Sequence, residues 1–221
     1  MFDKYPYLKN DIAICRKMSP EDAERLDAIT KEASVYRTLP TFLYELKYPD
    51  KKEVIRRMDE ECFDTGQSVL LGIYPADEPE VLAGIAEIYN YEAYKKKASI
   101  GYRIDESFSG RGLASAAAEL LTGYLLNEEG LRTVTAHVLS DNAASARVLR
   151  KNGFIKKYPG RYEDWGFDEL MLTDTYVRKA VWGNNDIDIY NIYRKEKHYV
   201  QKDEKKSAGA QSRGDNRSSQ E

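Results

Sequence analysis

Hydrophobic and polar positions follow two different periods along this chain, and the change from one period to the other marks its elements. Short apolar runs bounded by turn residues, such as SVLLGIY at residues 68–74, are typical of buried strands. Stretches with apolar residues three and four positions apart, such as residues 112–127, indicate helices. The first helix has a clear start, because Ser19 stands at the N-cap, Pro20 follows, and Asp22 lies three residues on.

The resulting order of elements is β α α β β β α β α β β. Helices are predicted from Ser19 onward, over residues 40–63 with an interruption near Tyr48 and Pro49, and over residues 112–127 and 143–152. Strands are predicted at residues 11–18, 68–74, 81–91, 98–105, 131–139, 154–162 and 169–177. This alternation predicts one α/β (α+β) domain with a mixed sheet and helices on its faces.

The composition changes sharply near the C-terminus. We expect the folded domain to cover residues 1–182. Residues 183–200 still carry apolar side chains, from Ile187 to Tyr193, which predicts a peripheral element docked on the domain or on the partner subunit of a homodimer. From Gln201 onward no large aliphatic or aromatic residue occurs, so residues 201–221 are expected to form a disordered polar tail.

The charge and cysteine content exclude several classes of protein. The 37 acidic and 34 basic residues give a net charge of −3, which argues against a general nucleic-acid binder. No apolar run approaches the roughly 18 residues of a membrane helix, and the N-terminus lacks the apolar core of a signal peptide, so we expect a cytoplasmic protein without a membrane partner. Two cysteines and two histidines in unrelated contexts predict neither a disulfide scaffold nor a metal site.

A glycine-containing turn, SGRG at residues 109–112, connects a predicted strand to a predicted helix. Glycines allow a tight turn, and the free N–H groups of the helix start favour a phosphate group. The turn is not a Walker loop, since no GK[ST] follows, and it lacks the third glycine of a dinucleotide fingerprint. On its own the turn fits either a phosphate site or one of the glycine turns that are common in α/β proteins.

A second motif follows about thirty residues later. The segment IGYRID with SGRGLASAA, then NAASARVLRKNGF, and finally EDWGFDELMLTDTYVRK together resemble the GNAT N-acetyltransferase superfamily, in its RimJ/RimL-like branch. The resemblance covers roughly residues 11–179. It implies acetyl-CoA as cosubstrate and a mostly antiparallel sheet, in which the strand before the glycine turn splays from its neighbour.

The resemblance also implies which residues hold acetyl-CoA. Backbone groups of Tyr102, Arg103 and Ile104 would line the pantetheine arm, and Asn142 would hydrogen-bond a pantetheine amide. The pyrophosphate would be bound by the amides of Ser109, Gly110, Arg111, Gly112, Leu113 and Ala114, and the Arg111 side chain would either add charge or point to solvent. The family pattern has Gln or Arg where this chain has Ser107, which weakens the motif without abolishing it.

Acetyl transfer to an amine needs a base, a donor for the oxyanion and an acid for the leaving thiolate. The resemblance implies a backbone N–H near Arg103 or Ile104 as the oxyanion donor. Many superfamily members use a tyrosine as the acid, but the matching position is Leu149 here, and the RimL-like branch implies Ser145 instead. The alternative for Ser145 is a serine that caps the helix backbone.

For the base, the resemblance implies a carboxylate on the strand after NGF, either Glu163 or Asp164. Both lie in the acidic, aromatic loop EDWGFDE, so a solvated surface role is the alternative. Glu87 is a third candidate, a water relay is compatible with all three, and His137 is interpreted as a hydrogen-bonded sheet residue.

The acceptor would enter between the first two helices and the last two strands, where the residues are aromatic and either grip an amine or close the core. These residues are Tyr36, Phe42, Tyr44, Tyr48, Tyr158, Tyr162 and Trp165. Our hypothesis is an acetyl-CoA-dependent N-acetyltransferase that acts by direct transfer on a protein N-terminus or a small-molecule amine. The alternative is a non-catalytic acyl-CoA-binding or interaction module on the same fold.

Overall fold

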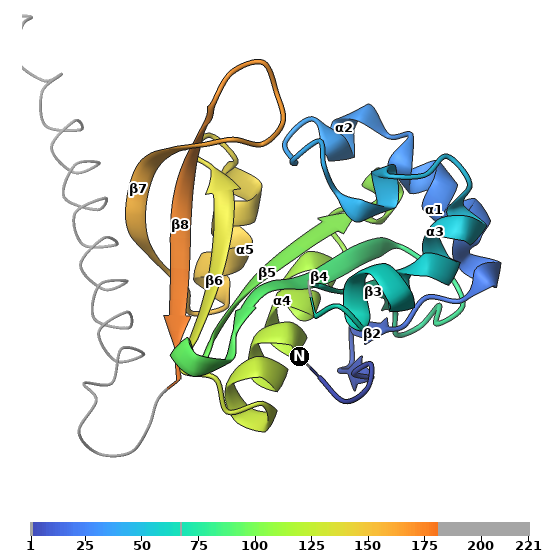
Figure 1. Cartoon of the computed structure of the whole chain (residues 1–221), viewed down its shortest axis with the longest axis horizontal. Coiled ribbons are helices and arrows are strands. Elements are labelled where there is room, and N and C mark those ends of the chain that lie inside the picture. Colours follow the sequence, from blue (N-terminus) through green and yellow to red (C-terminus); the bar gives the residue numbers. More distant parts are fainter. Residues whose placement is uncertain (1, 67, 181–221) are drawn as a thin grey trace, which may run out of the picture. The chain divides into compact units, whose positions relative to one another are not determined.

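One mixed sheet organises the computed structural model, which describes residues 2–66 and 68–180 (Figure 1). Its eight strands lie in the order β1-β2-β3-β4-β5-β6-β8-β7. The strands are β1 Leu8–Lys9, β2 Ala13–Arg16, β3 Ser68–Pro75, β4 Gly84–Glu92, β5 Lys97–Ile104, β6 Thr133–Leu139, β7 Ile155–Glu163 and β8 Met171–Lys179. Among the described strands only the β5–β6 pair is parallel, which confirms the expected mixed, mostly antiparallel sheet.

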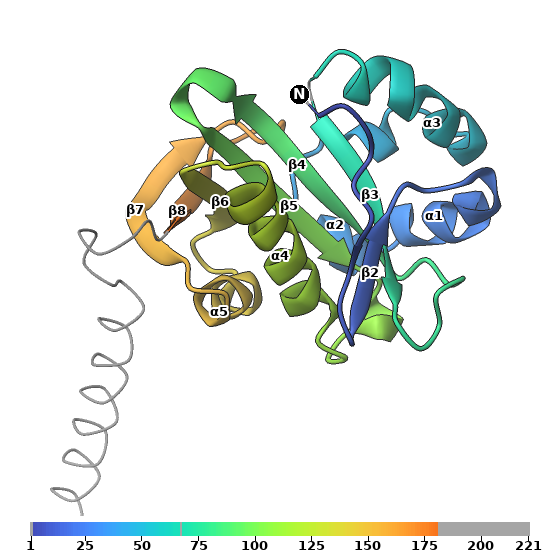
Figure 2. The ribbon, with the colours of Figure 1, turned by 90° about the horizontal axis from the view of Figure 1, so that it is seen from below.

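The helices cover both faces of this sheet (Figure 2). They are α1 Ala23–Thr30, α2 Ala33–Tyr36, α3 Lys51–Met58, α4 Leu113–Gly123 and α5 Ala143–Lys151, with π turns at Asp59–Phe63 and Tyr124–Glu128 and 3₁₀ turns at Pro20–Asp22, Tyr44–Leu46, Ala93–Lys95 and Glu106–Phe108. Helices α4 and α5 bury Leu121 and its neighbours on one face, whereas α1 and α3 bury Leu26 and Met58 on the other. Strand β3 is buried throughout, because Leu71 belongs to the first core and Leu70 to the second.

The sheet opens at its centre, between β5 and β6. These two strands pair at only three positions, Lys97 with Thr133, Ala98 with Val134 and Ser99 with Thr135. Beyond the last pair they diverge, so that β6, β8 and β7 lean away from β3, β4 and β5 (Figure 1). The splayed strand pair predicted from the sequence is therefore confirmed.

The capped start of the first helix is also confirmed, because the Ser19 N–H donates to the Asp22 carboxylate at 2.7 Å. The chain makes one 3₁₀ turn there before α1 begins at Ala23. The helix predicted over residues 40–63 is wrong in its first half: residues 37–43 are irregular, and only the turn Tyr44–Leu46 precedes α3. Contacts with a distant hairpin, described below, hold this segment out of a helix. The short elements β1 and α2 were not predicted.

The described residues fall in one compact unit, Met1–Ala180. The predictions for residues 183–200 and 201–221 lie outside the described residues. Within residues 2–66 and 68–180 no helix is both long and apolar enough to cross a membrane.

Candidate active site

A cavity of about 900 Å³ lies at the gap between β5 and β6, and residues from both faces of the sheet line it. Arg103 and His137 belong to the face that carries α1 and α3. Tyr102 packs against the core of the α4–α5 face, and Ser145 lies on α5 itself. Since one cavity collects residues from both faces, it passes through the sheet. Two molecules that enter from opposite faces would meet in the gap.

The turn between β5 and α4 has the backbone conformation of an anion cradle. Gly110 and Gly112 have φ of +80° and +83°, a region that favours glycine, and Gly112 is the N-cap of α4. In the described part of the chain, the N–H groups from Gly110 to Ala114 have no hydrogen-bond partner. Such free amides at a helix N-terminus are suited to a pyrophosphate.

One side chain and one amide of this turn are already engaged. The Ser109 N–H donates to the Glu106 carbonyl at 3.0 Å, so the free amides begin at Gly110 rather than at Ser109. The Arg111 guanidinium lies 3.2 Å from the Asp77 carboxylate and 2.7 Å from that of Glu78. Two carboxylates of the loop after β3 thus neutralise the Arg111 charge. We therefore expect the backbone N–H groups of the turn, rather than this side chain, to bind a phosphate.

The backbone of β5 alternates between its two neighbours. The Asp105 N–H donates to the Ala83 carbonyl at 2.9 Å, so these two residues form a hydrogen-bonded pair that continues the β4–β5 ladder. Because alternate residues of an antiparallel pair point to opposite sides, Arg103 turns its backbone polar groups toward β4. Tyr102 and Ile104 turn theirs toward the gap. The prediction that the Arg103 backbone lines the gap is therefore corrected, and Tyr102 and Ile104 remain as the candidates.

Helix α5 starts at the edge of the cavity. Its N-cap is Asn142, whose Oδ1 accepts from the Ser145 N–H at 3.0 Å and whose Nδ2 donates to the Thr38 hydroxyl at 3.4 Å. The capping role considered for Ser145 thus belongs to Asn142. The Tyr102 hydroxyl donates to the Ser145 carbonyl at 3.3 Å, and both residues line the cavity. Ser145 is half-buried.

On the opposite face, His137 and Glu163 form a hydrogen-bonded pair. The Nδ1 atom of His137 lies 2.7 Å from Oε1 of Glu163, and the Trp165 indole N–H donates to Oε2 of Glu163 at 3.1 Å. His137 and Glu163 keep about a quarter of their side chains exposed, at 27% and 25%, and all three residues line the cavity. No partner for Nε2 of His137 exists within the described residues. Nδ1 of the ring is therefore hydrogen-bonded, and Nε2 is free within the described residues.

Asp164 also lines the cavity but is largely exposed, and its Oδ1 accepts from the Gly166 N–H at 2.8 Å. Cys62 lines the cavity as well, where burial raises the pKa of its thiol to about 11. That thiol is neutral at physiological pH and is a poor nucleophile. Within residues 2–66 and 68–180 no group of His, Cys, Asp and Glu is arranged to hold a metal ion.

A buried ion-pair network forms the wall next to His137. Arg103 lies 2.5 Å from the Glu45 carboxylate and 3.3 Å from that of Glu87, and the Tyr36 hydroxyl donates to Glu45 at 3.0 Å. Burial raises the pKa of Glu87, although the Arg103 charge opposes that shift. One cation thus faces two carboxyl groups in this network.

Gly101 forms the floor of the cavity and leaves it bare, because glycine has no side chain. Gly101 pairs with Glu87 across β4 and β5. A side chain at Gly101 would first meet the ring of Tyr89, 3.7 Å from its Cβ. Burial raises the pKa of Tyr89, and the carboxylates of Glu87 and Glu163 raise it further, so the phenol stays protonated. Three of these groups, Glu87, Tyr89 and Glu163, therefore approach one another around this floor.

The segment of residues 38–42 crosses from α2 to the β7–β8 hairpin and closes one side of the cavity. The Thr41 N–H donates to the Trp165 carbonyl at 2.8 Å. Of the predicted aromatic walls, Phe42, Tyr44 and Trp165 line the cavity, whereas Tyr36 and Tyr48 pack against the α1–α3 core.

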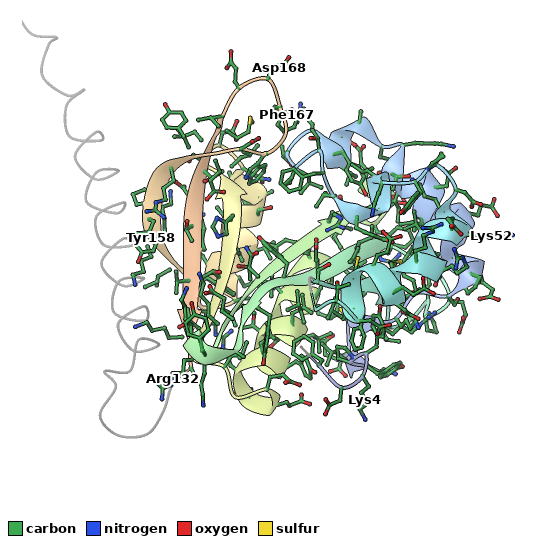
Figure 3. All side chains as sticks on the ribbon, viewed as in Figure 1. Lys4, Lys52, Arg132, Tyr158, Phe167 and Asp168 are labelled. Carbon is green, nitrogen blue, oxygen red and sulfur yellow. The ribbon has the colours of Figure 1, made fainter. Side chains whose placement is uncertain are left out.

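The other two predicted wall residues lie elsewhere. Tyr158 and Tyr162 are exposed, at 41% and 71%, and neither lines the cavity. Figure 3 shows Tyr158 on the outer flank of β7, away from the α1–α3 side, while Phe167 and Asp168 lie at the tip of the hairpin. The acceptor wall predicted from these two tyrosines is therefore wrong.

The family of the chain follows from comparison with known proteins. Residues 14–155 match the family model described as "Acetyltransferase (GNAT) domain". Because the match covers more than half of the chain, the protein belongs to the GNAT acetyltransferase family, whose members use acetyl-CoA as cosubstrate.

Several curated proteins are similar in sequence. The chain is 29% identical over 157 residues to the uncharacterized N-acetyltransferase YoaA of Bacillus subtilis, which covers 69% of this chain and 85% of that protein. It is 28% identical over 98 residues to the probable N-acetyltransferase YjcK of the same species, covering 44% and 54%. It is 33% identical over 90 residues to the ribosomal-protein-serine acetyltransferase of Escherichia coli, covering 41% and 49%. The chain thus spans about half the length of the last two relatives.

Solved structures share the fold. RimL, a ribosomal L7/L12 alpha-N-protein acetyltransferase in complex with coenzyme A, gives a TM-score of 0.66 at 18% identity, covering 79% of this chain and 98% of that one. Mycobacterium smegmatis RimJ in complex with CoA-disulfide gives a TM-score of 0.66 at 19% sequence identity, covering 80% of this chain and 87% of that one. A spermidine N-acetyltransferase, SpeG from Vibrio cholerae, gives a TM-score of 0.62 at 14% sequence identity, covering 77% of this chain and 95% of that one. Together with the sequence relatives, these structures confirm the predicted fold and the RimJ/RimL-like resemblance.

Proposed function

We propose that this protein transfers the acetyl group of acetyl-CoA to a cationic primary amine, directly, in a complex that contains both substrates. The observation that carries the proposal is the cavity through the β5–β6 gap, with Ser145 on one face of the sheet and the His137–Glu163 pair on the other. A thioester held in the gap would be reached by an amine from the α1–α3 face.

The residues present fit acetyl-CoA. Free amides from Gly110 to Ala114 suit its pyrophosphate, and the gap-facing backbone of Tyr102 and Ile104 suits the pantetheine arm. Asn142 lies at the same edge, where its amide would reach a pantetheine amide. These groups hold the cosubstrate by its diphosphate and its arm, which leaves the acyl end in the cavity.

Each chemical requirement then has a candidate group. An N–H of Tyr102 or Ile104 stabilises negative charge on the carbonyl oxygen, since a fixed donor there costs no reorganisation. The Ser145 hydroxyl protonates the leaving thiolate and regains its proton from solvent. The amine proton leaves on the opposite face, where Glu163 and Asp164 line the cavity. A covalent enzyme intermediate is not invoked, because Cys62 is a neutral thiol.

The charges of the cavity indicate what kind of amine it accepts. Its two permanent cations in the described part of the chain, Lys47 and Arg103, are both paired with carboxylates, Lys47 with Glu61 and Arg103 with Glu45 and Glu87. No cation is therefore left there for a carboxylate next to the reacting amine. A peptide N-terminus or a polyamine fits this balance, and a free amino acid does not.

The test is a thiol-release assay with acetyl-CoA and a panel of peptide N-termini, polyamines, free amino acids and the matching amino-acid amides, with acetyl-CoA binding measured separately. We expect release with at least one cationic amine, and kcat/KM at least about tenfold higher for an amide than for its free acid. Binding without release on every acceptor would favour the non-catalytic module. Absence of acetyl-CoA binding would overturn both readings.

A further inference from the structure

We propose that His137 takes the proton from the acceptor ammonium and that Glu163 is a positioning residue that holds His137 for this step. The inference rests on the proposed function and assigns one of its steps to a residue that neither the motifs nor the relatives indicate.

Hydrogen bonding distinguishes the two residues. Glu163 accepts one hydrogen bond on each oxygen, from His137 at 2.7 Å and from Trp165 at 3.1 Å. Both oxygens of Glu163 are thus already engaged by donors. When Nδ1–H of His137 donates to Glu163, the lone pair of the ring lies on Nε2, which has no partner within the described residues. The free basic atom of the pair is therefore on His137.

The position of His137 in the sheet supports the same assignment. Ser99 and Thr135 form the last β5–β6 pair, and their hydroxyls lie 2.8 Å apart on the α1–α3 face. Gly101 and His137 each follow two residues later and so project from that same face. His137 thus borders the place where the strands begin to separate, across from the bare floor at Gly101. An amine that attacks through the gap would pass between them.

The proton transfer balances without any further reactant. One N–H bond of the ammonium breaks, its electron pair stays on nitrogen as the attacking lone pair, and the proton bonds to Nε2 of His137. The resulting imidazolium faces the Glu163 carboxylate, which stabilises it, and its proton is then released to water. Imidazole suits this step because its charge changes near neutral pH.

Other charged and titratable groups line the cavity around the ring. They are Glu87 and Tyr89 on β4, Tyr102 and Arg103 on β5, Tyr44, Lys47 and Cys62 in and around the segment of α3, and Glu163 and Asp164 at the end of β7. Arg103 and Lys47 are compensated by carboxylates. The carboxylates left without a cation, Glu163 and Asp164, lie on the side of the cavity where they would attract a cationic amine toward the ring.

The experiment measures kcat/KM against pH for the full chain and for three variants, His137→Gln, Glu163→Gln and Asp168→Asn, with acetyl-CoA affinity and unfolding temperature recorded for each. Asp168 is an exposed acid on the same hairpin, so Asp168→Asn controls for a change of surface charge. We expect His137→Gln to lose about 10²-fold in rate and to lose the fall of rate at acid pH. Glu163→Gln should keep that fall, because Nε2 of His137 is still present, and should lose less rate than His137→Gln.

Two results would overturn the assignment: a His137→Gln variant within threefold of the parent rate, or loss of the acid limb in Glu163→Gln while His137→Gln retains it. Should His137→Gln not fold, His137→Ala with added imidazole serves instead, and imidazole must restore activity. A parent protein that binds acetyl-CoA but releases no thiol removes the proposed function as well. An active parent that is indifferent to His137 removes this inference alone.

Discussion

Thr41 donates both its backbone N–H and its hydroxyl to the carbonyl oxygen of Trp165, at 2.8 and 3.2 Å. This contact joins the 38–42 segment to the β7–β8 hairpin on the far side of the cavity. The indole of the same Trp165 holds Glu163, and Glu163 holds His137. The 38–42 segment, which closes one side of the cavity, is therefore connected by hydrogen bonds to Glu163 and His137. These are the residues that we propose position the base and remove the proton.

Gly166 makes this contact sterically feasible. Its φ is +79°, and a Cβ added there would lie 2.0 Å from the Thr41 hydroxyl. Gly166→Ala should separate the two segments, raise KM for the acceptor and lower kcat about tenfold, equivalent to about 1.4 kcal/mol. Acetyl-CoA affinity should not change, because the free amides at Gly110 belong to another loop. Steady-state kinetics and calorimetric titration measure the two effects separately.

Gly160 offers a matched control on the same hairpin. Its φ is +61°, but a Cβ there would meet only the Leu172 side chain, at 3.9 Å. Gly160→Ala carries the same kind of backbone strain, about 1 kcal/mol, without the clash. Equal loss of activity in the two variants would mean that strain in the hairpin, and not the contact with Thr41, controls the site.

The amide cradle is tested by a charge at Gly110. A side chain there meets nothing within 4 Å, so Gly110→Asp should fold normally apart from the strain of a φ of +80°. Its carboxylate would face the phosphate, and the Kd for acetyl-CoA should rise about 10²-fold or more. Gly110→Asn has nearly the same shape and strain without the charge and should bind far better. Similar affinities for the two variants would show that the phosphate does not lie there.

Ser145 is tested as the acid by removal of its hydroxyl. Ser145→Ala should lower kcat about 10²-fold while acetyl-CoA affinity changes little, since the helix cap comes from Asn142. Ser140→Ala is the control, because the Ser140 hydroxyl donates to Asp174 at 3.0 Å and Ser140 does not line the cavity. A turnover of Ser145→Ala equal to that of the parent would assign the proton to solvent or to another group.

Glu87 should make stability depend on pH. Burial raises the pKa of its carboxyl, so the folded protein holds this proton more tightly than the unfolded chain does. That stabilisation is fully present below the ordinary glutamate pKa of about 4.3 and is lost as pH rises through the folded value, at up to about 1.4 kcal/mol per pH unit. In urea titrations between pH 4 and 8, Glu87→Gln should remove this slope. The exposed Glu24→Gln should keep it, and an unchanged slope in Glu87→Gln would contradict the assignment.

Local signals in the sequence were sufficient for much of the fold. The cap at Ser19 and the glycine turn of residues 109–112 both depend on neighbours within four residues, and each lies where the pattern predicts. The buried run at β3 is equally local: it is buried along its whole length, with Val69, Leu71 and Ile73 in one core and Leu70 and Tyr74 in the other.

The pairing of His137 with Glu163 could not be predicted in the same way. The residues are 26 positions apart on strands β6 and β7, which meet only through β8. Register shifts interrupt the β7–β8 ladder between Lys156 and Tyr158 and again between Tyr158 and Arg161. Counting alternate residues along β7 therefore does not show which face Glu163 occupies. The same irregularity explains why Tyr158 and Tyr162 were assigned to the wrong surface.

The start of the helix predicted over residues 40–63 is irregular in the structure for a related reason. Its conformation is determined by Trp165 and Gly166, more than 120 residues away along the chain, and not by its own propensities. A short-range pattern cannot report a contact of that separation.

The three-pair ladder between β5 and β6 also has a consequence for kinetics. Under the proposed function, the acyl donor and the amine reach the gap from opposite faces, so neither occupies the entrance of the other. Binding order is then not imposed by access, and an inert amine analogue would inhibit without competing against acetyl-CoA. The brevity of one strand pairing thus favours random addition of the two substrates.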